Sequence, residues 1–290
     1  MANLFQKLQY NRLLKKGRSQ RSTIVEPSEA KLVICCVFKN EAEYLKEWIE
    51  FHLQQGFEKI YLIDNRSTDG YEKVLEPFVL KMQVEVSSTE NSSMDTFIQA
   101  KEYNRVLPII KKEQGEHCWV AFIDVDEFLF SVTNQPIREV LNGFMGKSVA
   151  GVLANWFMFG TSGLKRLDSK KTMVEQLTRR APDEHDEHRI SKPLVYLANA
   201  FKFFEGPHKP IAKGDSEYYY SDGTVFNRNK EQFIHSPLRI NHYWYRSEEY
   251  YENQKKANRK VFGGVRKVDL EKWHMERCNE EKDQEILQVK

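Results

Sequence analysis

Between residues 31 and 123, apolar runs of strand length alternate with stretches in which apolar residues recur every three or four positions. Helical spacing is found at 41–55 and again from about Asp95, where Pro108 predicts an end or a kink. The strand-like runs are 31–38, 59–64, 82–86 and 118–123. This alternation predicts an α/β fold with a Rossmann-like, mostly parallel sheet that is flanked by helices.

Composition divides the chain into three parts. Every charged residue before Glu26 is Lys or Arg, so residues 1–29 are predicted to form a basic N-terminal arm. Residues 30–250 are predicted to form one domain, regular at about 30–130 and less regular at about 131–250. Residues 251–290 are charged and helical in pattern and are predicted to form a C-terminal extension.

The charge balance and the cysteines restrict the class and location of the protein. Lys and Arg total 44 against 42 Asp and Glu, so no nucleic-acid partner is expected. The four cysteines form no CxxC pair, which favours a reducing compartment, and no segment is long and apolar enough to cross a bilayer. We therefore expect a cytoplasmic protein whose basic arm either contacts anionic lipid at the inner face of a membrane or is a solvated leader.

Two aspartates, Asp124 and Asp126, follow the last of these strand-like runs in the segment FIDVDEFLF. A buried unpaired carboxylate is costly, whereas a divalent cation with oxygen ligands removes that cost and can clamp a diphosphate. Sites in parallel sheets form at the carboxyl ends of strands. We expect Asp126, together with Asp124, to bind Mn²⁺ or Mg²⁺. Alternatively, Asp124 reaches the ribose of a bound nucleotide donor instead of the metal. The alternative is a structural turn.

Two further polar residues follow neighbouring strands. Asn40 comes after the first strand, and Asp64 ends the second, so both are expected near a bound donor. The Asp64 carboxylate could accept hydrogen bonds from a uracil or a ribose, or it could cap a helix. For Ser67 and Asp69, capping of the helix that follows them is the favoured interpretation.

An ordered set of motifs covers most of the chain, from about residue 31 to residue 260. It consists of CCVFKNEAEYLKEWIEFHLQQGFEKIYLIDNRSTDG, FIDVDEFLF, NWFMFGTSG, KPLVY with the later Pro207 and His208, and INHYWYRSEEYY. This set resembles glycosyltransferase family 92 and its bacterial family-2-like relatives. Asp64 matches the nucleoside-contacting acid, and Asp124 and Asp126 match the metal and ribose acids. Asn65 departs from the pattern, because many family-2 sequences have a second Asp there.

The resemblance implies a GT-A fold with a donor half at about 30–130 and an acceptor half at about 131–250. It implies a hexosyltransferase-type enzyme that moves a sugar, with inversion, from a nucleotide-sugar donor to an acceptor hydroxyl. We expect a UDP-linked donor, Mn²⁺ or Mg²⁺ as cofactor, and a glycan or lipid-linked acceptor in cell-surface polysaccharide or lipopolysaccharide synthesis.

The metal would need a ligand beyond the two aspartates, and two histidines match the family pattern. His208 and His242 both lie downstream among aromatic residues. His242 is favoured because the strand-like segment 240–245 would hold it rigidly. The alternative for each is a satisfied core or acceptor-stacking histidine.

The remaining candidates concern the acceptor and the leaving group. Glu175 is the first choice for the general base and Asp183 the second, although acids in such a run are usually solvated. Lys192 could reach the diphosphate, with a surface lysine as the alternative. Trp156 could stack against the acceptor sugar or be buried in the core.

One pattern is set aside. His185 and His188 are separated by two acids, which could suggest zinc, but no cysteine partner and no HExxH motif accompany them.

Two other functions compete with the transferase. In an aspartyl-nucleophile phosphatase, Asp124 would attack phosphorus and Asp126 would be the acid/base, but Glu127 and Phe128 stand where a Thr or Val usually follows. In a non-catalytic module, the chain would only bind nucleotide or glycan.

Overall fold

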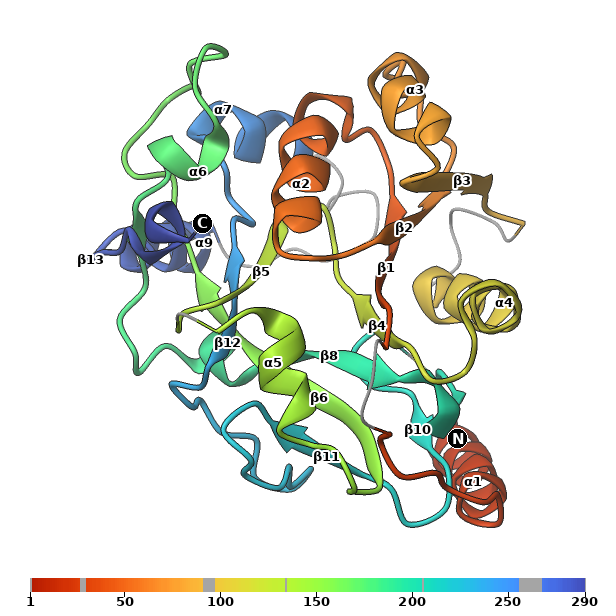
Figure 1. The fold of residues 1–290 in the computed structure, drawn as a ribbon. Helices are drawn as coiled ribbons and strands as arrows, with labels where there is room; N and C mark the ends of the chain where they lie inside the picture. The colour runs from red at the N-terminus through yellow and green to blue at the C-terminus, as the bar shows by residue number, and fades with distance from the viewer. Residues whose placement is uncertain are drawn as a thin grey trace.

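The computed structural model describes residues 2–26, 30–90, 97–133, 135–204, 206–255 and 268–289. A nine-stranded sheet with the order β3-β2-β1-β4-β8-β6-β12-β5, and with β11 paired to β6, forms the centre of the molecule (Figure 1). The strands are β1 (Leu32–Phe38), β2 (Lys59–Asp64), β3 (Val84–Ser88), β4 (Trp119–Phe122), β5 (Glu127–Ser131), β6 (Val149–Met158), β7 (Arg179–Arg180), β8 (Ser191–Tyr196), β9 (Ala200–Lys202), β10 (Ile211–Ala212), β11 (Glu217–Tyr220), β12 (Leu238–His242) and β13 (Glu281–Lys282).

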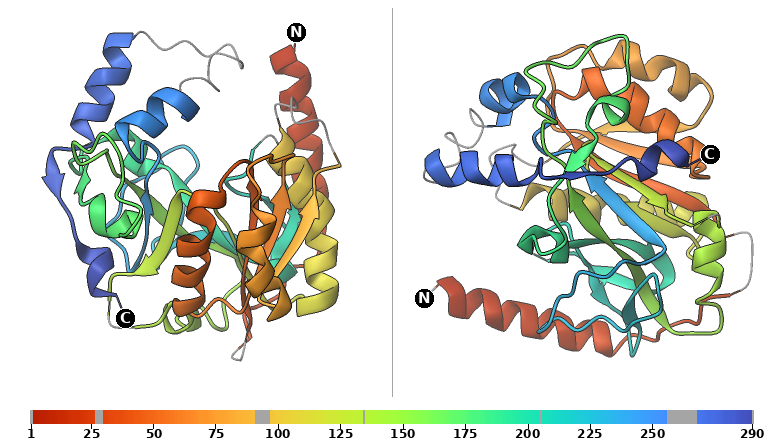
Figure 2. Two further views of the ribbon diagram at one scale, coloured as in Figure 1. Left: turned by 90° about the horizontal axis from the view of Figure 1, so that it is seen from above. Right: turned by 90° about the vertical axis from the view of Figure 1, so that its left-hand side faces the viewer.

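Helices surround this sheet on more than one side (Figure 2). They are α1 (Ala2–Arg18), α2 (Ala42–Gln54), α3 (Glu72–Leu80), α4 (Ile98–Gln114), α5 (Ile137–Asn142), α6 (Met173–Gln176), α7 (Glu248–Tyr250) and α9 (Val268–Arg277), with short helical turns η1 (Asp186–Arg189), η2 (Leu197–Asn199), η3 (Tyr251–Lys255) and η4 (Glu285–Gln288). Five of the eight strand pairings in the sheet are parallel, which confirms the predicted α/β fold with a mostly parallel sheet.

The first strand is apolar throughout because helices cover both of its faces. Ile34 belongs to the same core cluster as Trp48 of α2. Val33, one residue earlier, points the other way and packs in a second cluster with Tyr103 of α4. Alternate residues of a strand face opposite sides, so burial on both sides requires an unbroken apolar run.

The helix α4 differs from the expectation at Pro108. It begins at Ile98 and continues through Pro108 to Gln114, while residues 91–96 lie outside the described part. Proline removes one backbone donor, which usually ends a helix. Here Tyr103 and Ile110 are fully buried on either side of the proline, so packing against the sheet holds the helix together.

The second half of the chain completes the sheet in a mixed pattern. The strand β8 runs antiparallel to both β4 and β6. The strand β12, which comes late in the sequence, enters between β6, to which it is parallel, and β5, to which it is antiparallel. Its last residue, His242, is thereby paired with Glu127 of β5 and with Met158 of β6.

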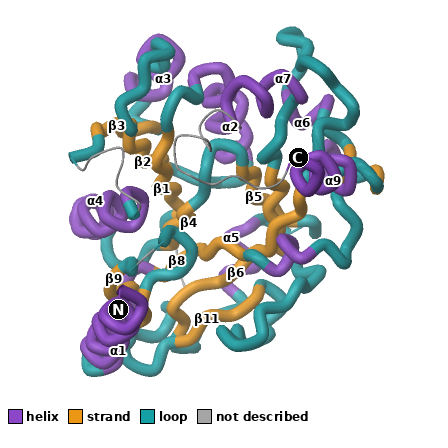
Figure 3. The backbone as a smooth tube through the Cα atoms, turned by 180° about the vertical axis from the view of Figure 1, so that it is seen from behind, coloured by secondary structure: helices purple, strands orange, loops and turns teal. Residues whose placement is uncertain are grey.

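The basic N-terminal segment begins with α1, which packs against β10 at one edge of the molecule, on the opposite side from α9 (Figure 3). A Cβ at Gly17 would lie 2.6 Å from the carbonyl oxygen of Ala212, so only glycine allows this close approach. Leu4, Phe5 and Leu8 are exposed on the helix. No described helix combines the length and apolar character needed to span a bilayer.

Candidate functional site

The two predicted metal-binding aspartates lie in the turn between β4 and β5, at the carboxyl edge of the parallel strands. The backbone N–H of Asp124 donates to a carboxylate oxygen of Glu127 over 2.9 Å, and the N–H of Glu127 donates to the Asp124 carbonyl over 3.0 Å. The indole of Trp48 donates to the Glu127 carbonyl over 2.8 Å. These bonds hold the turn rigidly, so the side chains at 124 and 126 are presented in defined directions.

Asp124 is paired with a buried lysine from β8. The Lys192 ammonium lies 2.9 Å from one Asp124 oxygen and 3.4 Å from Glu127, and its side chain is 1% exposed. The other Asp124 oxygen accepts a hydrogen bond from Gln99 over 2.7 Å. Burial opposes the lysine charge, but the carboxylates of Asp124 and Glu127 raise the pKa of Lys192. The expectation of a surface lysine is therefore wrong.

Asp126 is buried and faces two cationic or metal-binding groups. One of its oxygens lies 3.6 Å from Nε2 of His242, and the other accepts a hydrogen bond from the Lys255 ammonium over 2.6 Å. Burial alone would disfavour the charge, but Lys255 and His242 hold the pKa of Asp126 well below its usual range. The carboxylate is therefore ionised at neutral pH.

Asp126 and His242 are suitable ligands for one divalent ion. Neighbouring ligands of an octahedral ion with bonds of about 2.1 Å lie about 3 Å apart, close to the observed separation. Nδ1 of His242 is buried and has no hydrogen-bond partner, so the ring is free to turn slightly toward such an ion. A mixed carboxylate and imidazole set suits Mn²⁺ better than Mg²⁺, which prefers oxygen ligands.

An aromatic group lies beside His242. The Trp156 ring centroid is 4.3 Å from that of His242 and 5.7 Å from that of His208. Nδ1 of His208 is 3.4 Å from the Ser191 carbonyl, and burial, followed by the charges of Lys192 and Lys209, lowers the pKa of His208 to about 4. Within the described residues, His208 makes no hydrogen bond or ion pair with Asp126.

Asn40, in the loop after β1, and Asp64, the last residue of β2, lie at the same edge of the sheet. One Asp64 oxygen accepts a hydrogen bond from the Ser67 N–H over 2.8 Å, and the Asn40 side chain accepts one from Thr68 over 2.8 Å. Ser67 and Asp69 accept bonds from the backbone at Asn40 and Ala42, at the start of α2. Asp69 therefore caps the preceding helix α2, whereas Ser67 bonds to Asn40 just before that helix, and the prediction that the two residues cap the following helix is wrong.

The two candidate general bases, Glu175 and Asp183, interact with residues outside the acidic turn. The carboxylate of Glu175 accepts hydrogen bonds from the N–H and the hydroxyl of Thr172, which form a capping box at the start of α6. Asp183 pairs with Arg180 and with His235, each at 2.8 Å. In the described residues, neither carboxylate forms a hydrogen bond or ion pair with Asp124 or Asp126.

Arg246, which the sequence interpretation did not select, is fully buried near the acidic turn. Its guanidinium is 2.6 Å from a Glu41 oxygen and lies 3.7 Å from the Tyr44 ring centroid and 4.5 Å from that of Tyr250. Among the described residues, Nε and Nη2 have no hydrogen-bond partner, while Nη1 forms the ion pair with Glu41. Although burial opposes it, Glu41 raises the pKa of Arg246, so a permanent positive charge with free donors lies beside the site.

A small cavity opens next to these residues. Its volume is about 140 Å³, and its walls include Trp156, His242, Trp244 and His274. A larger hollow of about 420 Å³ lies beside Tyr44 and Tyr250. Aromatic walls next to ionised groups are typical of sites that bind a polar ring.

Acidic side chains, a buried lysine and an imidazole at the carboxyl edge of parallel strands are typical of the active sites of α/β enzymes. The chain belongs to glycosyltransferase family 92, whose family model matches residues 30–286.

Curated proteins of the same family are similar to part of the chain. A family 92 protein of Oryza sativa subsp. japonica is 29% identical over 182 residues, which cover 60% of this chain and 30% of the relative. One of Arabidopsis thaliana is 26% identical over 205 residues, covering 62% and 33%. The chain thus spans about a third of the length of these relatives.

Similar solved structures include residues 1–349 of S. aureus TarS and a mannosyltransferase. S. aureus TarS is 15% identical, with a TM-score of 0.40 and coverage of 84% of this chain and 69% of that one. The mannosyltransferase PcManGT from Pyrobaculum calidifontis, in complex with GDP-Man and Mn²⁺, is 17% identical, with a TM-score of 0.33 and coverage of 53% and 44%.

Proposed function

We propose that this chain transfers a sugar from a UDP-linked donor to a hydroxyl of a glycan or lipid-linked acceptor, with inversion at the anomeric carbon. The observation that carries the proposal is the 3.6 Å approach of Asp126 to His242 at the carboxyl edge of the sheet. Asp126 and His242 would hold a divalent ion, preferentially Mn²⁺, with Asp124 as a further ligand or a ribose contact. When bound, such an ion neutralises charge on the departing diphosphate.

The positively charged side chains of the site would also stabilise the negative charge of the diphosphate. Departure of a nucleoside diphosphate creates negative charge, which fixed cations stabilise without reorganisation. Lys192 and Arg246 are both buried and charged, and Arg246 has two unpaired donors that fit phosphate oxygens. We propose that these two residues bind the diphosphate. Lys255, which pairs with Asp126, would move aside as the ion binds.

We also propose contacts to the nucleoside and to the acceptor sugar at the same site. Asn40 and Asp64 would meet the nucleoside, since their loops lie at the same sheet edge as the acidic turn. Trp156 would stack on the acceptor sugar, with His208 on its ring or as an alternative metal ligand. The general base would be Glu175 or Asp183, reached after acceptor binding. Location in the cytoplasm, and contact of the basic N-terminal arm with a membrane in cell-surface glycan synthesis, belong to the same proposal.

The test is release of UDP from a panel of UDP sugars, measured with and without Mn²⁺ and acceptor. We expect Mn²⁺-dependent turnover that Asp126→Asn reduces by at least a hundredfold while the unfolding temperature stays close to that of the unmodified protein. Asp222→Asn, in an exposed turn, is the matched control and should retain full turnover. Unchanged turnover in Asp126→Asn would reject the proposed metal site.

A parallel assay separates the competing functions. Release of phosphate from a generic phosphate ester, lost in Asp124→Asn, would identify a phosphatase. Binding of UDP without turnover on any donor would identify a binding module.

A further inference from the structure

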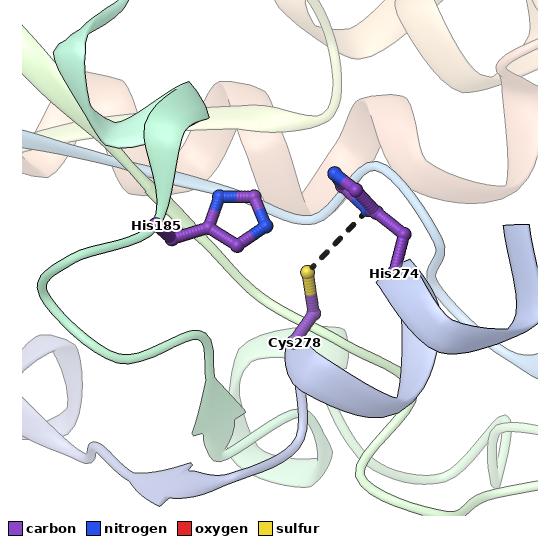
Figure 4. Close-up of side chains that lie close together, drawn as sticks. All are labelled: His185, His274 and Cys278. Atoms are coloured by element: carbon purple, nitrogen blue, oxygen red, sulfur yellow. Dashed lines mark hydrogen bonds between the residues drawn. The ribbon is translucent and has the colours of Figure 1, made fainter. Parts of the chain in front are cut away.

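A second group of metal-binding side chains lies outside the proposed donor site. His185 precedes η1, whereas His274 and Cys278 come from α9 and the residue just after it. One ligand atom of each residue lies within 4.8 Å of the others. Figure 4 shows the three side chains gathered in one place, contributed by segments far apart in the sequence. His185 and Cys278 are buried, and His274 is 13% exposed.

The hydrogen bonds around His274 prepare it as a ligand. Its Nε2 is 3.3 Å from a carboxylate oxygen of Glu187, and its Nδ1 is 4.0 Å from Sγ of Cys278. A carboxylate that accepts the proton of one ring nitrogen leaves the lone pair of the other nitrogen available, as in many zinc sites. The hydroxyl oxygen of Tyr245 lies 2.5 Å from the same Nδ1, so the His274 ring would have to turn away from this hydroxyl before its lone pair could bind an ion.

We propose that His185, His274 and Cys278 bind a structural zinc ion, with Glu187 orienting His274. One thiolate and two imidazoles form a soft nitrogen and sulfur set that selects zinc over Mn²⁺ or Mg²⁺. Tetrahedral ligands with zinc bonds of about 2.1 to 2.3 Å lie about 3.5 Å apart, so side-chain rotations suffice to close the site. A water molecule would complete the tetrahedron.

Zinc binding at this site carries two local costs. Burial raises the pKa of the Cys278 thiol, so the ion must displace its proton, and binding releases one proton. Nδ1 of His185 accepts a hydrogen bond from the Glu187 N–H over 3.3 Å. If the other ring nitrogen binds zinc, the ring proton must lie on Nδ1, and this hydrogen bond is lost. A hydrogen bond of this length is weak, so a zinc bond readily outweighs its loss.

The position of the site suggests what zinc would do. Glu187, His274 and His242 all line the 140 Å³ cavity beside Trp156. The ion would fasten α9 to the loop before η1 and so fix one wall of that cavity. An ion that binds only the folded chain also stabilises it by mass action.

The test uses the full chain, expressed with zinc, purified under reducing conditions without chelator, and measured by elemental analysis. We expect about one zinc per chain, lost in Cys278→Ser and in His185→Gln but retained in Cys118→Ser, a buried cysteine elsewhere in the fold. The proposal is overturned if the unmodified protein contains no more zinc per chain than the Cys278→Ser variant.

Cobalt substitution gives a readout that does not depend on the variants folding. The unmodified protein loaded with Co²⁺ should show a thiolate-to-cobalt charge-transfer band and intense tetrahedral d–d bands. Their absence at saturating Co²⁺ would also overturn the proposal. Asp126→Asn should keep both the zinc and the bands, so failure of this site is distinguishable from failure of the proposed transferase site.

Discussion

Glu127 and His242 are directly paired across the antiparallel strands β5 and β12. This register brings the imidazole next to the acidic turn, where Nε2 of His242 approaches Asp126 to 3.6 Å. His208, in contrast, contacts the ring of Trp156, which in turn contacts His242. The two histidines should therefore respond differently to substitution.

We expect His242→Gln to raise the Mn²⁺ concentration needed for half-maximal turnover by more than tenfold, because a ligand is lost. His208→Gln should leave that concentration within about threefold. The measurement is a Mn²⁺ titration of UDP release. A larger effect of His208→Gln would reverse the assignment of the third ligand.

Lys192→Met should strongly destabilise the fold. It removes the ammonium that is shared by Asp124 and Glu127 and leaves the buried Glu127 carboxyl group without its cation, whereas Asp124 is 30% exposed and keeps its bond from Gln99. Breaking a buried ion pair in this way costs about 3 to 5 kcal/mol. Denaturant unfolding measures the loss, and the double variant Lys192→Met with Glu127→Gln should recover part of it. No recovery would mean that packing, not charge, causes the effect.

Stability should fall in acid partly because of His52. This ring is fully buried, with Nδ1 bonded to the Trp48 carbonyl and Nε2 accepting from the Leu129 N–H over 3.1 Å. Burial lowers the pKa of His52 from 6.5 to about 3. Between about pH 3 and 6.5, His52 is therefore protonated in the unfolded chain but neutral in the folded chain. The free energy of unfolding consequently rises with pH in this range and decreases as the pH falls from about 6.5 toward 3.

The matched variant is His52→Gln, which keeps a donor and an acceptor but does not titrate. Its unfolding free energy should depend less on pH between 6.5 and 3 than that of the unmodified protein. Burial lowers the pKa of His188 in the same direction, so some dependence should remain in the variant. Equal slopes for the two proteins would contradict the role assigned to His52.

Gly160→Ala should loosen the C-terminal segment. A Cβ at this position would lie 2.6 Å from the carbonyl oxygen of Cys278, so the segment must move. Overpacking of this kind costs about 1 to 3 kcal/mol. We expect faster proteolysis near residue 278 and weaker zinc retention, whereas Gly223→Ala, where no neighbour lies within 4 Å, should not loosen this segment.

Local patterns in the sequence were sufficient to predict much of the sheet. The second strand matches its predicted range of 59–64, and the third begins two residues later than the predicted 82. The helix before Pro108 was predicted, but its continuation to Gln114 was not, because that part of the helix is stabilised by tertiary packing. The capping role of Glu175 could have been recognised from the Thr and Glu three residues apart, a capping-box pattern.

The chemistry of the site depends more on long-range pairing. No spacing rule reveals that Lys255 meets Asp126 or that Arg246 meets Glu41, although both cations follow closely after INHYWY. Likewise, zinc was considered for His185 only together with His188 and was set aside for lack of a cysteine, because Cys278, which lies close to His185 in the fold, is far along the chain. Both cases require strand order and register, which a single sequence does not specify.

The late entry of β12 has a consequence for how the protein matures. During synthesis the acidic turn leaves the ribosome long before residue 242, and the strand carrying the imidazole must then insert between two strands already made. A nascent chain therefore holds the aspartates without their nitrogen partner. The proposed metal site can therefore form only when nearly all of the sheet has been assembled.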